Sequence, residues 1–235
     1  MTDAVPQQLS LSIQLLDDAT FANYWVAPSN RIALKALEYF CCGQGDLSVF
    51  LWGASGCGLT HLLQACSHQS QLPIAYLPLK DALDLNPAEV CANLENIPLV
   101  CVDDVECLAT NPEWEQAFFH LFNRLRDNGH RLLMAAHENP STINLPLPDL
   151  RSRLLGSVIY RVDTLDTEHK ALALQMRAKT RGMKMSLDVA SYVIKRTPNR
   201  MKDLFDALNE LDAVSLQQKK KLSLRFVKEL LDAKS

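Results

Sequence analysis

The feature that most constrains the fold is a glycine-rich segment that reads Gly53-Ala54-Ser55-Gly56-Cys57-Gly58-Leu59-Thr60. This spacing is typical of a phosphate-binding loop, in which glycines let backbone N–H groups wrap around phosphates at the N-terminus of a helix. The apolar run 47–52 before it predicts a strand, and the segment from His61 to Cys66 predicts a helix. Because strand, loop and helix follow in the required order, a nucleotide site is a better interpretation than a simple turn.

Leu59 stands where such a loop has a lysine. The ammonium of that lysine reaches the outer phosphates and neutralises the charge that develops as the terminal bond breaks. Leucine carries no charge, and the loop contains no Arg or Lys that could replace it. We therefore expect the loop to hold a nucleotide and to hydrolyse it poorly.

A second motif is the apolar run that begins at Pro98 and ends in Asp103 and Asp104. It predicts a buried parallel strand with carboxylates at its carboxyl end. In proteins with a phosphate-binding loop, the first acid and the loop threonine, here Asp103 and Thr60, hold the Mg²⁺ that accompanies the nucleotide. The second acid, Asp104, would polarise an attacking water. A strand that ends in a polar turn is the alternative, which the order of the two motifs disfavours.

The composition limits the class of protein. A chain of 235 residues with 48% hydrophobic residues can build an α/β domain and a small second domain. The net charge of −3 and a pI near 6.1 predict no basic field for broad contact with nucleic acid, so DNA is not expected as the main partner. Neither a signal peptide nor a membrane-spanning run is recognisable, so we expect a cytoplasmic protein.

The seven cysteines favour reduced, mostly buried thiols over disulfides, because the count is odd and no paired metal-ligand spacing occurs. A zinc site can be drawn from four residues near the loop, but its spacing matches no zinc pattern and the loop already explains the region. The four are Cys57, His61, Cys66 and His68.

The pattern of apolar residues divides the chain into a flexible arm (1–19), an α/β domain (20–163) and a helical domain (164–235). The α/β domain is expected to be a parallel sheet with helices on both faces, and the two domains to clasp a ligand between them. Further strands are predicted at 72–77, 131–136 and 158–162, and helices at 28–42, 86–94 and 112–128. Helices of the last domain are predicted at 167–181, 186–196, 200–217 and 223–233. Lys219-Lys220-Lys221 is interpreted as a solvated turn.

Three segments, 21–31, 53–63 and 118–125, resemble the nucleotide domain of the DnaA family of AAA+ proteins, and the resemblance covers roughly residues 17–215. It implies an AAA+ fold in which the helical domain is the lid. A full initiator also needs an amino-terminal domain and a helix-turn-helix after the lid, which we do not expect here. The short form resembles the Hda family, the regulatory inactivators of DnaA.

The resemblance implies roles for further residues. Arg153 matches the arginine finger, which would act on a neighbour's nucleotide; without the resemblance it would be a surface arginine at a helix end. Gln8, Leu9, Ser10 and Leu11 match a clamp-binding peptide in the arm, although alone they would suggest a frayed tail. Additional nucleotide contacts are expected from Trp25 and Val26, from His137 at the first sensor position, and from Met201 and Lys202 at the second, with Arg200 as an alternative.

These roles imply a negative regulator of DNA replication initiation. The chain would dock on the sliding clamp, the beta subunit of DNA polymerase III, hold a nucleoside diphosphate, expected to be ADP, with or without Mg²⁺, and stimulate ATP hydrolysis by DnaA. Direct specific DNA binding is not expected, and self-association stays open. Two alternatives remain: an active AAA+ ATPase that remodels a partner, and a DnaA-like adaptor that recruits without hydrolysis.

Overall fold

A computed structural model describes residues 19–218 and 220–232. Five parallel strands form one sheet in the order β2-β3-β4-β1-β5. Their bounds are β1 (Ser48–Trp52), β2 (Ile74–Pro78), β3 (Leu99–Asp103), β4 (Arg131–Ala136) and β5 (Val158–Arg161). Every residue of β3 is buried, because helices cover both faces of the sheet. The predicted α/β fold is confirmed, and the carboxyl ends of the strands meet at one edge.

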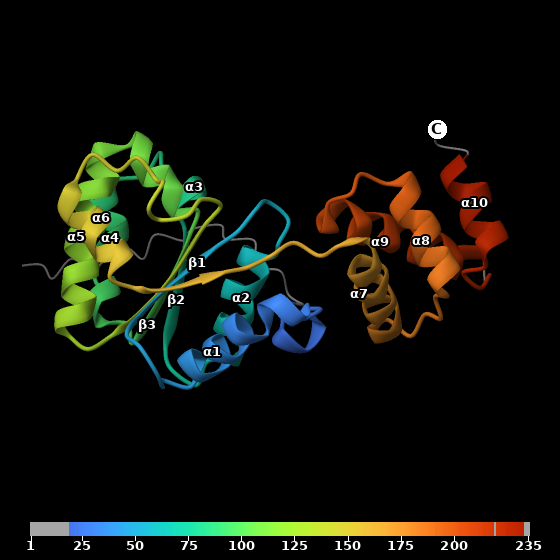
Figure 1. The fold of residues 1–235 in the computed structure, drawn as a ribbon, viewed down its shortest axis with the longest axis horizontal. Coiled ribbons are helices and arrows are strands. Elements are labelled where there is room, and N and C mark those ends of the chain that lie inside the picture. The colour runs from blue at the N-terminus through green and yellow to red at the C-terminus, as the bar shows by residue number, and fades with distance from the viewer. Residues whose placement is uncertain (1–18, 219, 233–235) are drawn as a thin grey trace, which may run out of the picture.

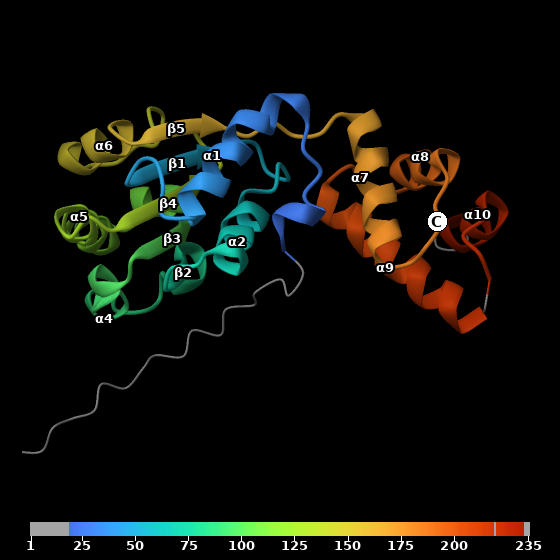
Figure 2. The same cartoon turned by 90° about the horizontal axis from the view of Figure 1, so that it is seen from below.

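Side chains of alternate residues along a strand enter two separate cores. Val49 and Leu51 of β1 pack with α1 (Arg31–Cys41), α2 (Leu59–Gln69) and the 3₁₀ turn η1 (Phe21–Asn23). A second 3₁₀ turn, η2 (Pro28–Asn30), leads directly into α1. Figures 1 and 2 show α1 and α2 on one face of the sheet and α5 on the other.

Phe50 of β1 points to the opposite core, whose largest side chain is Trp114. Four helices and two 3₁₀ segments cover this face: α3 (Leu79–Ala82), α4 (Pro87–Cys91), η3 (Leu94–Asn96), η4 (Val105–Thr110), α5 (Pro112–Asp127) and α6 (Pro148–Leu155). The N-terminus of α5 is well defined, because the Asn111 side chain accepts a hydrogen bond from the Trp114 N–H (3.2 Å) and Pro112 opens the first turn.

The helical lid has a core of its own, built from Leu174, Val193, Leu208 and Phe226. It contains α7 (Thr167–Thr180), α8 (Leu187–Arg196), α9 (Met201–Gln218) and α10 (Leu224–Asp232). Figure 1 shows it at the opposite end of the long axis from the sheet, joined by an extended segment after β5. The first lid helix, α7, also contacts η1 of the α/β domain. No described helix is long and apolar enough to span a lipid bilayer.

Two predicted helices differ from the structure. The helix expected over 86–94 ends at Cys91, because Ala92 is extended and Asn93 adopts a left-handed conformation (φ 67°) before the turn η3. The helix expected from Pro28 starts with a 3₁₀ turn and becomes α-helical at Arg31. Helices α3 and α6 were not predicted as separate elements.

Candidate functional site

The glycine-rich loop lies between β1 and α2, at the carboxyl edge of the sheet. Gly56 (φ 86°) and Gly58 (φ 96°) adopt left-handed conformations that other residues rarely take, and Gly58 directly precedes α2. A Cβ on Gly53 would lie only 2.1 Å from the Val162 carbonyl oxygen, so only glycine fits there. Ala54, Ser55 and Gly56 are exposed. The loop therefore presents backbone N–H groups to solvent at a helix N-terminus, as an anion site requires.

Tyr24 braces this loop. Its hydroxyl donates a hydrogen bond to the Cys57 carbonyl oxygen (2.9 Å), and its ring lies so close to Gly58 that a Cβ there would be 2.8 Å from Tyr24 Cε2. Next to it, the His61 ring pairs through Nε2 with the Thr20 carbonyl oxygen (2.9 Å). The sequence predicted that Trp25 and Val26 contact the nucleotide. It did not point to their neighbour Tyr24.

Leu59 is buried. Only 3% of it is exposed, and it packs in the apolar core with Leu63 and Val162. The position that carries a lysine in other phosphate-binding loops thus contributes to the hydrophobic core. The loop itself contributes no positive charge.

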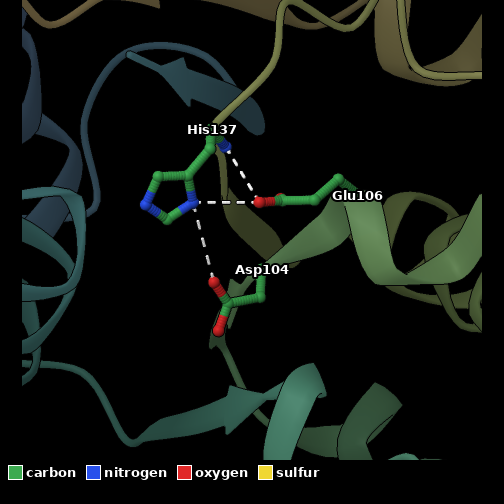
Figure 3. A group of neighbouring side chains, drawn as sticks. All are labelled: Asp104, Glu106 and His137. Atoms are coloured by element: carbon green, nitrogen blue, oxygen red, sulfur yellow. Dashed lines mark hydrogen bonds and ion pairs between the residues drawn. The ribbon is translucent and has the colours of Figure 1, made fainter. Parts of the chain in front are cut away.

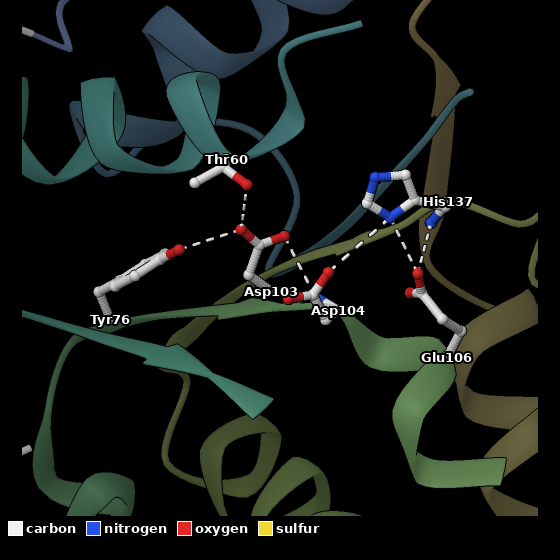
Figure 4. A network of polar contacts seen from close by, with 6 residues as sticks. All are labelled: Thr60, Tyr76, Asp103, Asp104, Glu106 and His137. Carbon is white, nitrogen blue, oxygen red and sulfur yellow. Dashed lines mark hydrogen bonds and ion pairs between the residues drawn. The ribbon is translucent and has the colours of Figure 1, made fainter. Parts of the chain in front are cut away.

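Asp103 is the centre of a polar network below the loop (Figure 4). Its Oδ2 accepts hydrogen bonds from the Thr60 hydroxyl (2.7 Å) and from the Tyr76 hydroxyl (3.0 Å). Burial raises the pKa of Asp103, and these hydrogen bonds oppose the rise. Burial, together with the charge of Asp103, also raises the pKa of Tyr76. Thr60 and Asp103 bring together the hard oxygen atoms that Mg²⁺ prefers, so this pair fits the predicted ion.

A second group of polar side chains surrounds Asp104 (Figure 3). Glu106 Oε1 accepts from both the backbone N–H (3.2 Å) and Nδ1 (2.9 Å) of His137, and Nδ1 lies 3.8 Å from Asp104 Oδ1. One potential ligand atom of each of the three residues lies within 4.8 Å of the others. His137, expected as a sensor, is thus held by Glu106, a residue that the sequence did not single out.

Asp104 has an unusual backbone and an unusual proton affinity. It adopts a left-handed conformation (φ 57°) at the end of β3. Burial, followed by repulsion from Asp103 and Glu106, raises the pKa of Asp104 to about 6, while His137 and Lys80 lower it. Lys80 follows β2, which pairs with β3 in the sheet. Its positive charge lowers the pKa of Asp104. The strand order brings this cation to the acids, which the sequence alone did not indicate.

Arg153 lies in the last turn of α6, away from the loop. The position of α6 is fixed by Glu115, which is 3% exposed and whose Oε1 accepts from the Leu147 N–H (2.8 Å) at the start of the helix. Among the described residues, no carboxylate forms an ion pair with Arg153, whereas its neighbour Arg151 donates to the Ser141 carbonyl oxygen (2.8 Å). Arg153 itself is half-buried.

The predicted sensor residues of the lid lie at the start of α9. Lys202 is exposed and Met201 packs against the lid core. Arg200, the alternative, is engaged in the same region, because it forms an ion pair with Asp203 (Nε to Oδ2, 2.6 Å). Within the described ranges, no hydrogen bond joins these lid residues to the glycine-rich loop, so their predicted nucleotide contacts stay predictions.

Two further predictions concern residues outside this geometry. The peptide Gln8–Leu11 lies outside the described residues. All seven cysteines are described and free, and only Cys42 is fully exposed. The metal-ligand grouping found among the described residues is the one around Asp104, and it does not include the alternative zinc set near the loop.

Comparison with known proteins gives matches along most of the chain. Residues 166–231 match the family model described as "Hda, lid domain", and residues 81–160 match "Bacterial DnaA ATPAse domain". The fold resembles domain III of the Thermotoga maritima replication initiation protein DnaA, with a TM-score of 0.78 and 22% identity over 94% of this chain and 98% of that chain.

Two other solved structures share the fold. AMPPCP-bound DnaA from Aquifex aeolicus has a TM-score of 0.74 and 21% identity over 85% of this chain and 67% of that chain. The Thermotoga maritima RuvB Holliday junction branch migration motor has a TM-score of 0.66 and 16% identity over 86% of this chain and 66% of that chain. The predicted AAA+ arrangement of sheet domain and helical lid is therefore confirmed.

Proposed function

Because the chain is a DnaA-homologous, Hda-like AAA+ protein, we propose that it is a nucleotide-holding adaptor that docks on the DNA sliding clamp and stimulates ATP hydrolysis by DnaA. The observation that carries the proposal is the contrast between two residues. Leu59 removes the positive charge from the chain's own loop, and Arg153 offers a positive charge to another molecule. A protein arranged in this way supplies catalysis in trans.

A bound nucleotide is supported by the loop and its surroundings. The loop N–H groups suit phosphates, and Thr60 with Asp103 would hold Mg²⁺, which would neutralise phosphate charge when bound. Trp25 Nε1 is buried and has no hydrogen-bond partner among the described residues, so it is a donor for the base. The Aquifex aeolicus DnaA structure holds AMPPCP, which supports a nucleotide ligand of this kind.

The absence of a loop lysine favours a diphosphate over a triphosphate. A γ-phosphate adds negative charge that Leu59 cannot neutralise, whereas the loop N–H groups suffice for the inner phosphates. We therefore propose ADP as the resident nucleotide, with its base identity resting on the family relationship.

Arg153 would act on ATP held by DnaA. An arginine supplied in trans stabilises the charge that develops on the transferred γ-phosphoryl group. Glu115 holds α6 in a fixed place, so the guanidinium is presented from a rigid element. Docking on the clamp through Gln8–Leu11 would place the protein where replication has begun, and would make it a cytoplasmic negative regulator of initiation.

The test is ATP hydrolysis by purified ATP-loaded DnaA in the presence of clamp on primed DNA. We expect the protein to accelerate hydrolysis, Arg153→Ala to lose the acceleration, and Arg151→Ala, on the same helix, to keep most of it. Gln8→Ala with Leu9→Ala should lose clamp binding and acceleration together. Full acceleration by Arg153→Ala would show that the finger assignment is wrong and would favour the recruitment adaptor.

A second candidate, an active AAA+ ATPase that remodels a partner, is favoured by Lys80. Its charge lowers the pKa of Asp104, so a cation from outside the loop acts on the acid that would polarise water. This candidate predicts appreciable ATP turnover by the isolated protein, lost in Lys80→Ala and in Asp104→Asn. The adaptor predicts turnover close to background in all three.

A further inference from the structure

The charge of the chain is divided unequally between its two domains. Residues 164–235 contain 15 Lys and Arg against 9 Asp and Glu, a formal net charge of +6, whereas residues 1–163 contain 9 against 18, a net charge of −9. The overall charge of −3 conceals this difference. Because the lid buries its apolar side chains in its own core, its cations lie on its surface.

Helices α8 and α10 lie side by side (Figure 1), and six of the lid cations lie on them or on the segment before α10. Tyr192 marks the centre of this surface: Lys228 Nζ lies 5.5 Å and the Arg196 guanidinium carbon 5.7 Å from its ring centroid. Lys195 and Arg225 are exposed beside them. We define the α8–α10 face as Tyr192, Lys195, Arg196, Lys220, Lys221, Arg225 and Lys228.

Among the described residues, two cations of the α8–α10 face are paired with acids. Asp232 pairs with Arg196 (3.0 Å), and Glu229 pairs with Arg225 (3.0 Å). The lysines have no ion pair with a carboxylate in the part of the chain that the structure describes; they are Lys195, Lys220, Lys221 and Lys228. The face thus keeps a surplus of positive charge.

The shape of α10 decides which anionic partner fits. Its apolar residues Phe226 and Val227 are 5% and 0% exposed, and Leu224, Leu230 and Leu231 are partly buried against the lid core, so the helix offers little apolar surface to insert into a lipid layer. A protein interface would need an exposed aromatic or apolar centre, but the Tyr192 ring is covered by two cations. The same two cations compete with a single-stranded base for the ring of Tyr192.

We propose that the α8–α10 face binds the phosphate backbone of duplex DNA without sequence preference. Lysines on α8, on α10 and on the segment before α10 suit evenly spaced phosphates, and nothing on the face is arranged to read base edges. This goes beyond the proposed function, because it places the lid on the duplex independently of Arg153. The choice of DNA over duplex RNA rests on that function, which acts where the clamp encircles DNA.

The test is fluorescence anisotropy of a labelled 20-base-pair duplex titrated with the full chain at 50 to 200 mM KCl. Four to six phosphate contacts predict a slope of log K against log[KCl] of about −4 to −5. The test variant combines Lys195→Gln, Lys221→Gln and Lys228→Gln. It should lose about a thousandfold in affinity at 50 mM KCl and about three units of slope.

The matched control removes three exposed cations of the α/β domain: Arg31→Gln, Lys35→Gln and Arg126→Gln. It should bind the duplex as the wild type does. Arg153→Ala should also bind normally, so failure of the arginine-finger proposal and failure of this one are distinguishable. Circular dichroism of every variant shows whether the lid is folded.

Several outcomes would overturn the proposal. One is equal binding by the wild type and the test variant, and another is an equal loss in the control. Parallel titrations with a duplex RNA, with phosphatidylserine vesicles and with polyglutamate identify another partner. Tighter binding to any of these than to the DNA duplex, lost in the test variant, would reassign the face to that class.

Discussion

The side chain of Asn30 and the backbone of Asp163 are joined by two reciprocal hydrogen bonds. Asn30 Nδ2 donates to the Asp163 carbonyl oxygen and the Asp163 N–H donates to Asn30 Oδ1, each at 2.9 Å. Asn30 is 1% exposed and directly precedes α1, while Asp163 lies between β5 and the lid. One buried amide therefore fixes the place where the chain leaves the sheet domain for the lid.

Asn30→Ala should lower the free energy of unfolding by about 1–3 kcal/mol, because it leaves the half-buried N–H and carbonyl of Asp163 without these partners. Urea unfolding measures this loss. Amide hydrogen exchange at Asp163 should also become faster than in Lys35→Ala, a control at an exposed residue of α1. Unchanged exchange at Asp163 would contradict the assigned hydrogen bonds.

Glu115→Ala should cost about 1–3 kcal/mol of stability, since it removes the acceptor of the half-buried Leu147 N–H. If Glu115 positions α6, stimulation of DnaA by Arg153 falls several-fold as well. Glu115→Gln keeps a side-chain oxygen at the same place and should restore stimulation. If folded Glu115→Ala stimulates DnaA as well as the wild type does, the position of α6 set by Glu115 is not needed for stimulation.

Leu59→Lys tests what the buried leucine does. It should destabilise the nucleotide-free protein by about 2–4 kcal/mol, because it removes a buried apolar side chain and introduces a charge. Leu59→Met, close in volume, should cost less than about 1.5 kcal/mol. Calorimetric titration should show ATP affinity rising about tenfold relative to ADP in Leu59→Lys. A constant ratio of the two affinities would mean that this position does not reach the phosphates.

The loop thiol should be unreactive at neutral pH. Burial raises the pKa of Cys57 to about 11, so at pH 8 about one thiol in a thousand is ionised. Iodoacetamide should therefore alkylate the exposed Cys42 first, and labelling of Cys57 should speed up as pH rises toward 11. Peptide mass spectrometry follows each site. Labelling of Cys57 as fast as Cys42 at pH 8 would contradict its burial.

The sheet and the long helices could be predicted because their signals are local. Parallel strands buried on both faces are short apolar runs, as in β3, and α5 carries its cap, its proline and its apolar stripe in sequence. Helix α6 was not predicted as an element, since its position depends on Glu115, which lies 32 residues away. A contact at that separation leaves no periodic pattern.

The same distinction holds for the site. Thr60 and Asp103 could be paired from two motifs, and the structure joins them at 2.7 Å. Tyr76, Lys80 and Glu106 could not be found, because their place beside the acids depends on strand order and on the turn after β3. The unequal charge of the two domains was not predicted for a simpler reason. The net charge of the whole chain is a sum over two domains of opposite sign.

The two domains carry opposite net charges and lie at opposite ends of the long axis, so the protein is an electric dipole along that axis. In the field of any polyanion such a molecule experiences a torque. The torque turns the lid toward the polyanion before contact and turns the sheet domain away from it. Orientation would then precede collision, and the fraction of productive encounters would fall as added salt shortens the reach of that field.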